Sequence, residues 1–465
     1  MAIISIFSRR APALAAALLA GTTVVSLSAC SLDKLVGVKD PEVGQQLTQD
    51  AVQSRAGGVG LFNSSMARLQ QGVSALNLDV AEFTDELTLL SPNDFDYFDA
   101  FVPTEDFDLR MERLDALGQR RLVSQSYHKL QEARVAATQA RSVLRALNDT
   151  SLAPLIAASY AVEGFSIVLL AETQCSGIPL TRTDYGGTIV YGEGLSTAEL
   201  LQAAIARFDS SLAITHDSAR FTTLARVGKG RAYLGLGQYA LAAQAVASVA
   251  PADQFTLTFT DAETPGSTQS DYFYWLSLFN GRVLLGTEIV NHEGNNGIVW
   301  FTDPAQIDPR VPVTTDGPTA FTFAVRTMKY VDPSPTVALA RWIDAKMIRA
   351  EYDLSVGDVQ WLTELNDARR TVGLADTTDP GNALARVDLL FRERAYWFYG
   401  EGARLGDFRR LVRQYNRPAA QVYPGGAYTR SIFGIQFYGD ALVFSPPPEE
   451  VANNYRYQGC INKEP

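Results

Sequence analysis

The chain has 465 residues, of which 46% are hydrophobic, and 40 Lys and Arg stand against 51 Asp and Glu, for a formal net charge of −11. This length is ample for a large core and permits several domains or one large helical body. The acidic balance argues against nucleic-acid binding, because there is no general excess of cations to neutralise phosphates. It also argues against electrostatic docking on anionic lipid.

Residues 1–29 have the pattern of an export signal. Arg9 and Arg10 precede an uncharged, apolar run over 11–25, and a small-residue cleavage site follows. The apolar run is too short to span a bilayer as a helix. The cleavage site, Leu27-Ser28-Ala29-Cys30, looks like the lipobox of bacterial lipoproteins. We therefore predict that Cys30 is acylated and anchors the protein to a membrane, in preference to an ordinary secretory signal with a chance Cys.

The first part of the mature chain has a helical pattern followed by an irregular stretch. The pattern over 41–81 predicts helix, with an interruption at the glycines of 57–60. Residues 82–108 are acidic, aromatic and turn-forming, which predicts a loop with little regular structure.

Helical patterns return after this loop. Residues 110–148 are rich in Ala, Leu, Arg and Gln and predict one long helix or two, and Ser151 is a plausible N-cap for an apolar helix over 152–173. A Gly- and Tyr-rich loop is expected over 176–194. Ser196 and Glu199 then open a helix with the spacing of a capping box.

The clearest repeat signature follows over residues 230–247. The spacing Gly-x2-Tyr and then Gly-x-Tyr-x2-Ala is that of a tetratricopeptide (TPR) hairpin, in which small residues let two antiparallel helices approach closely. Residues 345–369 show a similar helix-turn-helix pattern, and the helix at 152–173 is a candidate for part of a third hairpin. Residues 253–335 instead predict loops and short strands, such as the alternating run 255–259.

These patterns predict a mostly α fold, namely a TPR-like scaffold of helical hairpins with long inserted loops and a few short strands. After the signal peptide, we expect residues 30–465 to form a single domain. Its N-terminal part covers about 30–250, a loop-rich insertion covers 251–335, and a C-terminal helical part with a tail covers 336–465. Long loops on a rigid frame are where binding usually takes place.

Several segments together resemble the SusD/RagB family of outer-membrane nutrient-binding lipoproteins. They are the lipobox at Cys30, the hairpin at 230–247, the helical pair at 342–369, the helix at 391–410 and the Pro-x-x-Glu tail from 446 to 454. The resemblance covers nearly the whole mature chain. One departure is Tyr457-Gln458-Gly459-Cys460, where the family often has a Gln-Asn pair.

The resemblance implies a function. Such proteins cover a SusC-like TonB-dependent outer-membrane transporter, bind glycans or peptides outside the cell, and are not enzymes. We therefore expect a lipid-anchored, outward-facing protein that binds a nutrient, most often an oligosaccharide or polysaccharide, and delivers it to the transporter. The alternatives are a peptide-importing protein of the same build and a periplasmic helical-repeat scaffold that binds only other proteins.

Residue types for catalysis are present, but their spacing does not favour a catalytic site. The three histidines, none in a metal-ligand spacing, are His128, His216 and His292. Glu393 and Glu401 are the sharpest carboxylate candidates, since they are expected on one face of a helix with Trp397 between them. The charged residues around them are Arg394, Arg404, Asp407 and Arg409. We therefore expect an ion-pair network that fixes this helix in the body, and no catalytic residues.

Aromatic and polar residues gather in three loop clusters that suit a sugar, because aromatic rings pack on its apolar face while amides, acids and Arg bond its hydroxyls. The predicted ligand contacts are Asn93, Asp96, Tyr97 and Phe98 in the first cluster, Tyr272 and Trp275 in the second, and Arg326 and Tyr330 in the third. Core packing and contact with the transporter are the competing explanations.

We expect no cofactor and no metal site. A structural calcium ion is the weaker alternative at the first cluster, where Asp94, Asp96 and Asp99 alternate. Cys175 and Cys460 either form a disulfide, as an oxidising compartment favours, or remain buried thiols.

Overall fold

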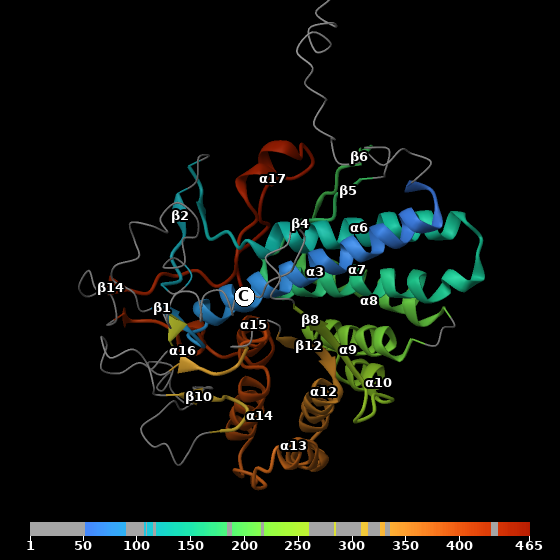
Figure 1. Ribbon diagram of the computed structural model, residues 1–465. Coiled ribbons are helices and arrows are strands. Elements are labelled where there is room, and N and C mark those ends of the chain that lie inside the picture. Colours follow the sequence, from blue (N-terminus) through green and yellow to red (C-terminus); the bar gives the residue numbers. More distant parts are fainter. Residues whose placement is uncertain are drawn as a thin grey trace, which may run out of the picture. The chain divides into compact units, whose positions relative to one another are not determined.

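The protein is described from a computed structural model, whose elements are labelled in Figure 1. The chain divides into two units, 1–48 and 49–465, and all of the described residues lie in the second. The structure describes residues 52–89, 107, 109–114, 118–183, 188–214, 218–259, 283–284, 308–314, 326–330, 335–428 and 436–465. Cys30, the signal segment and the first two aromatic clusters therefore lie outside the described residues.

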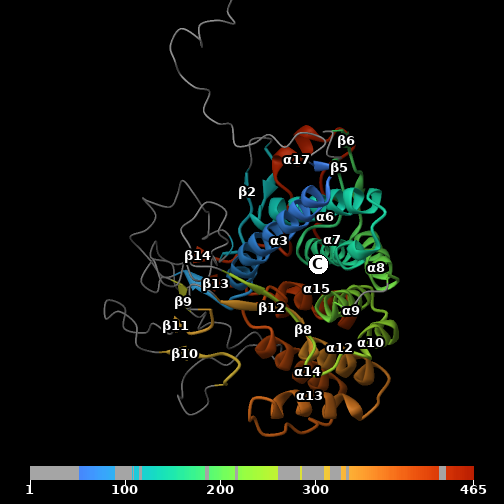
Figure 2. The same cartoon turned by 45° about the vertical axis from the view of Figure 1, so that its right-hand side comes forward.

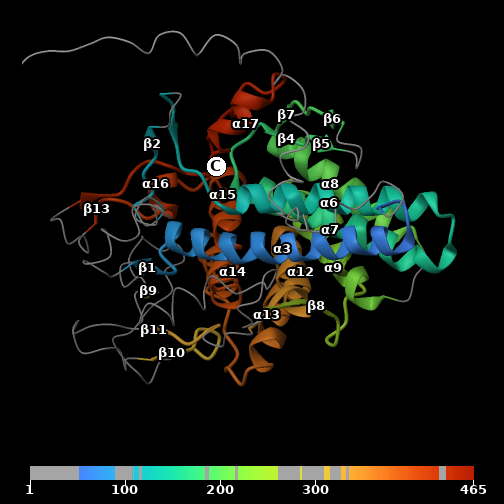
Figure 3. The ribbon, with the colours of Figure 1, turned by 45° about the horizontal axis from the view of Figure 1, so that its top comes forward.

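Four long helices build the N-terminal half of the described unit. They are α3 (Arg55–Phe83), α6 (Ser126–Ala146), α7 (Ala153–Thr173) and α8 (Thr197–Leu212), and each packs on the next. Figures 1 and 3 show α3 and α6 side by side along their lengths. The α8 capping box is confirmed, because Ser196 accepts from the Glu199 amide and Glu199 accepts from the Ser196 amide.

The predicted interruption at residues 57–60 is wrong, because α3 runs straight through these glycines. The reason is close packing. A Cβ on Gly58 would lie 2.7 Å from Leu144 Cδ2, and one on Gly72 would lie 2.9 Å from Leu130 Cδ2. The helix begins instead at Arg55, after its N-cap Ser54, whose hydroxyl accepts a hydrogen bond from the Gly57 amide.

The predicted helix over 110–148 is also shorter than expected. Arg110 and Gly118 adopt left-handed backbone conformations, with φ of 53° and 72°, which no α-helix contains. The described part of this stretch contains a short antiparallel pair, β2 (Arg113–Leu114) with β3 (Arg120–Arg121), and helix begins only at Ser126.

The helix over 152–173 is confirmed as α7, but Ser151 is not its N-cap. Asp149 accepts from the Ser151 amide at the start of a short 3₁₀ turn, Thr150–Leu152, that leads into α7. This helix is long and apolar enough to cross a membrane by length and composition alone, and most of it is buried inside the described unit. A helix that is apolar on all sides is typical of a protein core as well as of a membrane span.

Both predicted TPR-like hairpins are present. The first pairs α9 (Ala219–Gly235) with α10 (Tyr239–Val246), and the second pairs α12 (Trp342–Ser355) with α13 (Gln360–Arg370). Figure 2 shows α9, α10, α12 and α13 following one another as a stack. Gly230 allows the close approach that the repeat requires, because a Cβ there would meet Val246 Cγ1 at 2.8 Å and Ile348 Cδ1 at 3.0 Å.

The described strands are short, and all of their pairs are antiparallel. The longest pair, β8 (Gln254–Thr258) with β12 (Thr336–Arg341), confirms the strand predicted near 255–259. The others are β1 (Thr88–Leu89) with β9 (Val283–Leu284), β4 (Ile178–Pro179) with β7 (Gly194–Leu195), β5 (Arg182–Thr183) with β6 (Ile189–Val190), β10 (Val313–Thr314) with β11 (Arg326–Thr327), and β13 (Ala427–Tyr428) with β14 (Gln436–Phe437). The predicted mostly α architecture with a few short strands is confirmed.

The C-terminal region differs from the prediction of a continuous helix over 391–410. Helix α14 (Ala383–Trp397) ends before Glu401, and α15 begins at Arg404 and ends at Tyr415. The turn between them contains Gly400 and Gly402 at φ of 63° and 68°, values that glycine adopts without strain. Two short helices follow, α16 (Ala419–Val422) and α17 (Pro448–Asn453). A disulfide joins Cys175 to Cys460 and so fastens the tail beside α7.

Candidate functional site

An open groove lies beside α16, between residues 419–426 and residues 438–442. Its volume is about 640 Å³, which is within the usual range for small-molecule sites. Figure 2 shows α15 near the middle of the described unit and β13, β14 and β9 together on one side of it. The described residues that line the groove are Arg110, Ala419, Ala420, Gln421, Tyr423, Pro424, Gly425, Gly426, Tyr438, Gly439, Asp440 and Leu442.

Arg110 links the two walls of the groove by hydrogen bonds. Its Nε and Nη2 donate to the carbonyl of Ala441 at 3.0 and 2.6 Å, and its Nη1 donates to the carbonyl of Pro424. The backbone continues the link, because the Gly439 amide donates to Leu109 O at 2.7 Å. Burial lowers the pKa of Arg110 to about 10, so the guanidinium remains charged near neutral pH.

The aromatic side chains of the groove are fixed by hydrogen bonds. Tyr423 is buried, and its hydroxyl donates to the carbonyl of Leu442 at 3.1 Å while the Arg110 guanidinium lies 4.9 Å from its ring centre. Tyr438 is half-buried, and its hydroxyl donates to Asp85 Oδ2 at 2.9 Å. Both rings are therefore held in place before any ligand arrives.

The exposed groups of the groove are polar and small. The side chains of Gln421 and Asp440 are exposed, and so is the backbone at Gly425 and Gly426. Together they offer an amide, a carboxylate and a glycine backbone beside the half-buried ring of Tyr438. This combination can bind a ring-shaped ligand that has one apolar face and many hydroxyl groups.

Buried acidic residues lie behind this groove at the end of α3. Asp85 and Glu86 are 1% and 0% exposed. Burial raises the pKa of Glu86 to about 7, although the Arg404 guanidinium and a 3.4 Å hydrogen bond from the Gly400 amide both favour its charged form. Glu86 thus connects the end of α3 to the turn between α14 and α15.

Glu401 is the centre of a buried ion-pair cluster. Its two carboxylate oxygens contact Lys329 Nζ at 2.8 Å and Arg341 Nη2 at 2.7 Å. Burial alone would raise the pKa of Glu401, but the two cations outweigh it and hold the pKa below its ordinary value. Tyr330, a predicted ligand contact, is half-buried with its hydroxyl 3.5 Å from Glu401 Oε1, so it is anchored in this cluster.

Glu393 lies in a second ion-pair cluster and is 2% exposed. Its two oxygens pair with Arg310 and Arg369. Three further ion pairs lie nearby. Asp407 of α15 pairs with Arg394 of α14 and with Arg410 of α15, and Arg410 also pairs with Glu351 of α12. The predicted ion-pair network is confirmed, with one correction: the partners of Glu393 and Glu401 come from segments remote in the sequence, not from the adjacent residues of the same helix.

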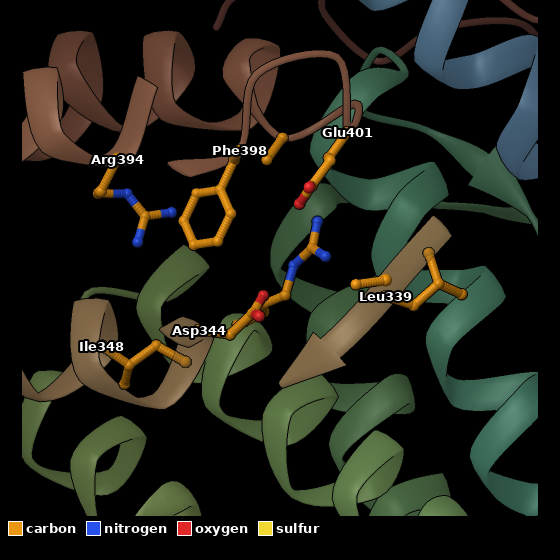
Figure 4. Close-up of a pocket in the computed structure, with 9 residues that line it drawn as sticks. Leu339, Asp344, Ile348, Arg394, Phe398 and Glu401 are labelled. Carbon is orange, nitrogen blue, oxygen red and sulfur yellow. The ribbon is translucent and has the colours of Figure 1, made fainter. Parts of the chain in front are cut away.

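A small cavity of about 20 Å³ lies between α12, β12 and the segment that joins α14 to α15, and Figure 4 shows the side chains that line it. Phe398 and Arg394 lie on one side of it, Leu339 lies on the other, and Asp344 and Glu401 point into the space between. A volume of this size holds about one water molecule. A sugar ring is far too large for it, so the open groove is the better candidate for a ligand.

The described residues test only part of the predicted site. Asn93, Asp96, Tyr97, Phe98, Tyr272 and Trp275 lie outside them, as do the aspartates of the calcium alternative. Arg326 lies in β11, where it pairs with Thr314 in the backbone ladder. No group of three metal-ligating side chains occurs within the described ranges. The groove itself was missed, although Pro424-Gly425-Gly426 is a turn signal that marks its position.

Comparisons with known proteins bear on the fold. No model of a protein family matches this chain, and no curated protein matches it. Among solved structures, it is similar to surface glycan-binding protein A from Bacteroides uniformis, with a TM-score of 0.60 and 11% identity over 88% of this chain and 99% of that chain.

Two further solved structures agree with this likeness. A SusD-like protein from Bacteroides fragilis has a TM-score of 0.59 and 13% identity, covering 93% of this chain and 99% of that one. A SusD superfamily protein from Bacteroides vulgatus has a TM-score of 0.58 and 13% identity, covering 88% of this chain and 99% of that one. The resemblance predicted from the sequence motifs is therefore confirmed in three dimensions, and the chain has the SusD-like fold.

Proposed function

We propose that this protein binds carbohydrate at the surface of a bacterial outer membrane and delivers it to a TonB-dependent transporter. The observation that carries the proposal is the open groove of about 640 Å³, with its fixed tyrosines and exposed amide and carboxylate, in a fold shared with a surface glycan-binding protein. Other solved proteins of this fold are described as carbohydrate-binding or as putative sugar-binding proteins.

The groove is suited to a saccharide by its mixture of surfaces. A sugar ring packs its C–H face on an aromatic side chain, and its hydroxyls act as both donors and acceptors toward planar polar groups. Tyr438 supplies the aromatic surface, and Gln421 and Asp440 supply the polar groups. The three loop clusters predicted from the sequence remain candidates for further ligand contacts.

In this proposal, acylated Cys30 anchors the protein to the membrane. The segment from Cys30 to the start of α3 at Arg55 has 24 intervening residues, which span at most roughly 80 Å when fully extended. Mass spectrometry of the purified membrane form tests acylation, and Cys30→Ala is expected to release the protein from the membrane.

The proposal assigns no catalytic role to the chain. A glycosidase requires one carboxylic acid that can donate a proton and one free carboxylate. Glu393 and Glu401 are instead ion-paired and buried, which supports a role in holding the helices together. We expect that carbohydrate incubated with the purified protein is recovered unchanged.

The deciding experiment has two readouts. Purified protein is first tested for binding to a panel of polysaccharides by affinity electrophoresis. Tagged protein is then recovered from detergent-solubilised outer membranes and its companions are identified. Retardation by at least one polysaccharide, with a TonB-dependent barrel in near-equal amount, supports the proposal. Recovery of periplasmic proteins only, without polysaccharide binding, favours the scaffold alternative, and co-purified peptide favours peptide import.

A further inference from the structure

The two charged side chains that line the groove, among the described residues, are placed very differently. Arg110 is 4% exposed, and each of its guanidinium nitrogens donates to a backbone carbonyl of the groove walls. Its guanidinium nitrogens are used to hold the walls, and the side chain is covered by them. A ligand in the groove therefore has little direct contact with the guanidinium, although its charge still acts on Asp440 and Asp85.

Asp440, in contrast, is exposed. The exposed groups near it in the lining, Gln421, Gly425 and Gly426, are uncharged. A second carboxylate, Asp85, accepts the hydroxyl hydrogen bond of Tyr438 at 2.9 Å, but it is buried like Arg110 and interacts with it electrostatically. Of the charged groups in the described lining, Asp440 is therefore the one that a ligand can contact directly.

We infer that this groove selects uncharged saccharides over acidic ones, and that Asp440 is the residue that determines this specificity. The inference rests on the proposed carbohydrate-binding function. A carboxylate accepts hydrogen bonds from the hydroxyls of a neutral sugar. The carboxylate or sulfate of an acidic sugar would instead lie near Asp440, and such like-charge contact weakens binding by repulsion.

The size of the discrimination follows from Coulomb's law. Two like charges about 6 Å apart, at a dielectric constant between that of water and half of it, disfavour binding by about three- to tenfold. Because salt screens charges at this distance, the discrimination should shrink markedly between 0.1 M and 1 M NaCl. A preference that came from shape alone would not respond to salt in this way.

The test uses polysaccharides matched in backbone but different in charge. Starch, cellulose and xylan are each presented unmodified, as the neutral hydroxyethyl derivative and as the anionic carboxymethyl derivative, and binding is measured by affinity electrophoresis and calorimetry. The variant Asp440→Asn removes the charge and keeps the shape. Glu449→Gln on α17 is the control, since it makes the same change in net charge at a residue outside the groove lining.

We expect wild type and Glu449→Gln to bind the hydroxyethyl form about three- to tenfold more tightly than the carboxymethyl form, and Asp440→Asn to bind both about equally. Equal binding of both forms by wild type, or an unchanged preference in Asp440→Asn, would overturn the inference while leaving carbohydrate binding in place. If none of the polysaccharides or derivatives binds to wild type, the proposed function fails and this inference fails with it.

Discussion

The ion-paired frame around α14 and α15 and the groove beside α16 use the same kinds of residue in opposite ways. In the frame, Glu393, Glu401 and Asp407 are buried and each contacts two cations. In the groove, Asp440 is exposed while the neighbouring cation, Arg110, faces the backbone. The carboxylates that stand out in the sequence therefore stabilise the helices, whereas the exposed carboxylate of the described groove lies in the irregular segment after β14.

This contrast separates stability from binding. A change in the frame should lower the free energy of unfolding and leave the groove chemistry intact in the molecules that remain folded. A change on the exposed side of the groove should weaken ligand binding with little effect on unfolding. The four predictions below test that separation, beginning with the largest expected effect.

Replacing Glu393 by Ala should cost the most stability. The substitution leaves the buried Arg310 with Asp308 as its remaining carboxylate partner and removes the carboxylate that pairs with the half-buried Arg369. Breaking a buried ion pair from one side typically destabilises a protein by about 3–5 kcal/mol. Chemical denaturation measures the loss, and Glu449→Ala, on the surface helix α17, serves as a control expected to stay within about 0.5 kcal/mol. A loss below about 1 kcal/mol for Glu393→Ala would show that the frame does not depend on this cluster.

Glu86 should make stability depend on pH. Its pKa is raised from 4.5 to about 7 in the folded protein, mainly by burial. Between these pH values the folded state binds more protons than the unfolded chain. The stabilisation that Glu86 contributes through its proton is therefore full below about pH 4.5 and is lost as pH rises through 7. Glu86→Gln has no titrating group at this position. Its free energy of unfolding should therefore rise relative to that of the wild type by about 3 kcal/mol between pH 4.5 and pH 8.

The measurement for Glu86 is a set of denaturation curves for both proteins across that pH range. The difference between the two proteins is the informative quantity, because other groups whose pKa is raised by burial, such as Asp344 at about 6, also titrate in this range. A difference that is the same at both ends of the range would contradict the role assigned to Glu86.

Two glycines of α3 provide a sharper test of packing. Gly58→Ala puts a methyl group 2.7 Å from Leu144 Cδ2 and should destabilise by about 1–3 kcal/mol. Gly60→Ala, in the same helix, meets nothing within 4 Å and should stabilise by about 0.5–1 kcal/mol. Thermal unfolding of the two variants side by side checks both signs. Equal effects would mean that helix propensity, not the contact with α6, governs this helix.

The smallest change in stability is expected for Gln421→Ala in the groove. Gln421 is exposed, so unfolding should change by less than about 0.5 kcal/mol. Loss of a hydrogen bond to a bound saccharide should weaken binding by about two- to tenfold. Gln360→Ala, exposed on α13, is the matched control. Binding that is unaffected by Gln421→Ala would separate this residue from the ligand site.

Sequence patterns predicted those parts of the fold whose cause is local. The hairpin α9–α10 follows from glycines and tyrosines at fixed offsets, because small residues at those positions permit close helix contact. The break between α14 and α15 was missed, since the apolar and charged pattern continues through Gly400 and Gly402 while the backbone turns.

The groove and the ion pairs depend on contacts between distant residues, which periodicity does not reveal. Arg110 lies within a stretch that reads as helix, and its partners lie more than 300 residues further along the chain. The partners of Glu393 likewise come from Arg310 and Arg369. Charge and residue type indicated that a network exists, but only the fold determines which cation meets which carboxylate.

The disulfide between Cys175 and Cys460 sets an order of events during biogenesis. It closes a covalent ring across 285 positions, and its second cysteine follows every described helix in the sequence. The ring cannot close before Cys460 has been synthesised, when all of the described helices have already left the ribosome's active site. If the chain is exported, as proposed above, oxidation also waits until Cys460 has crossed the inner membrane.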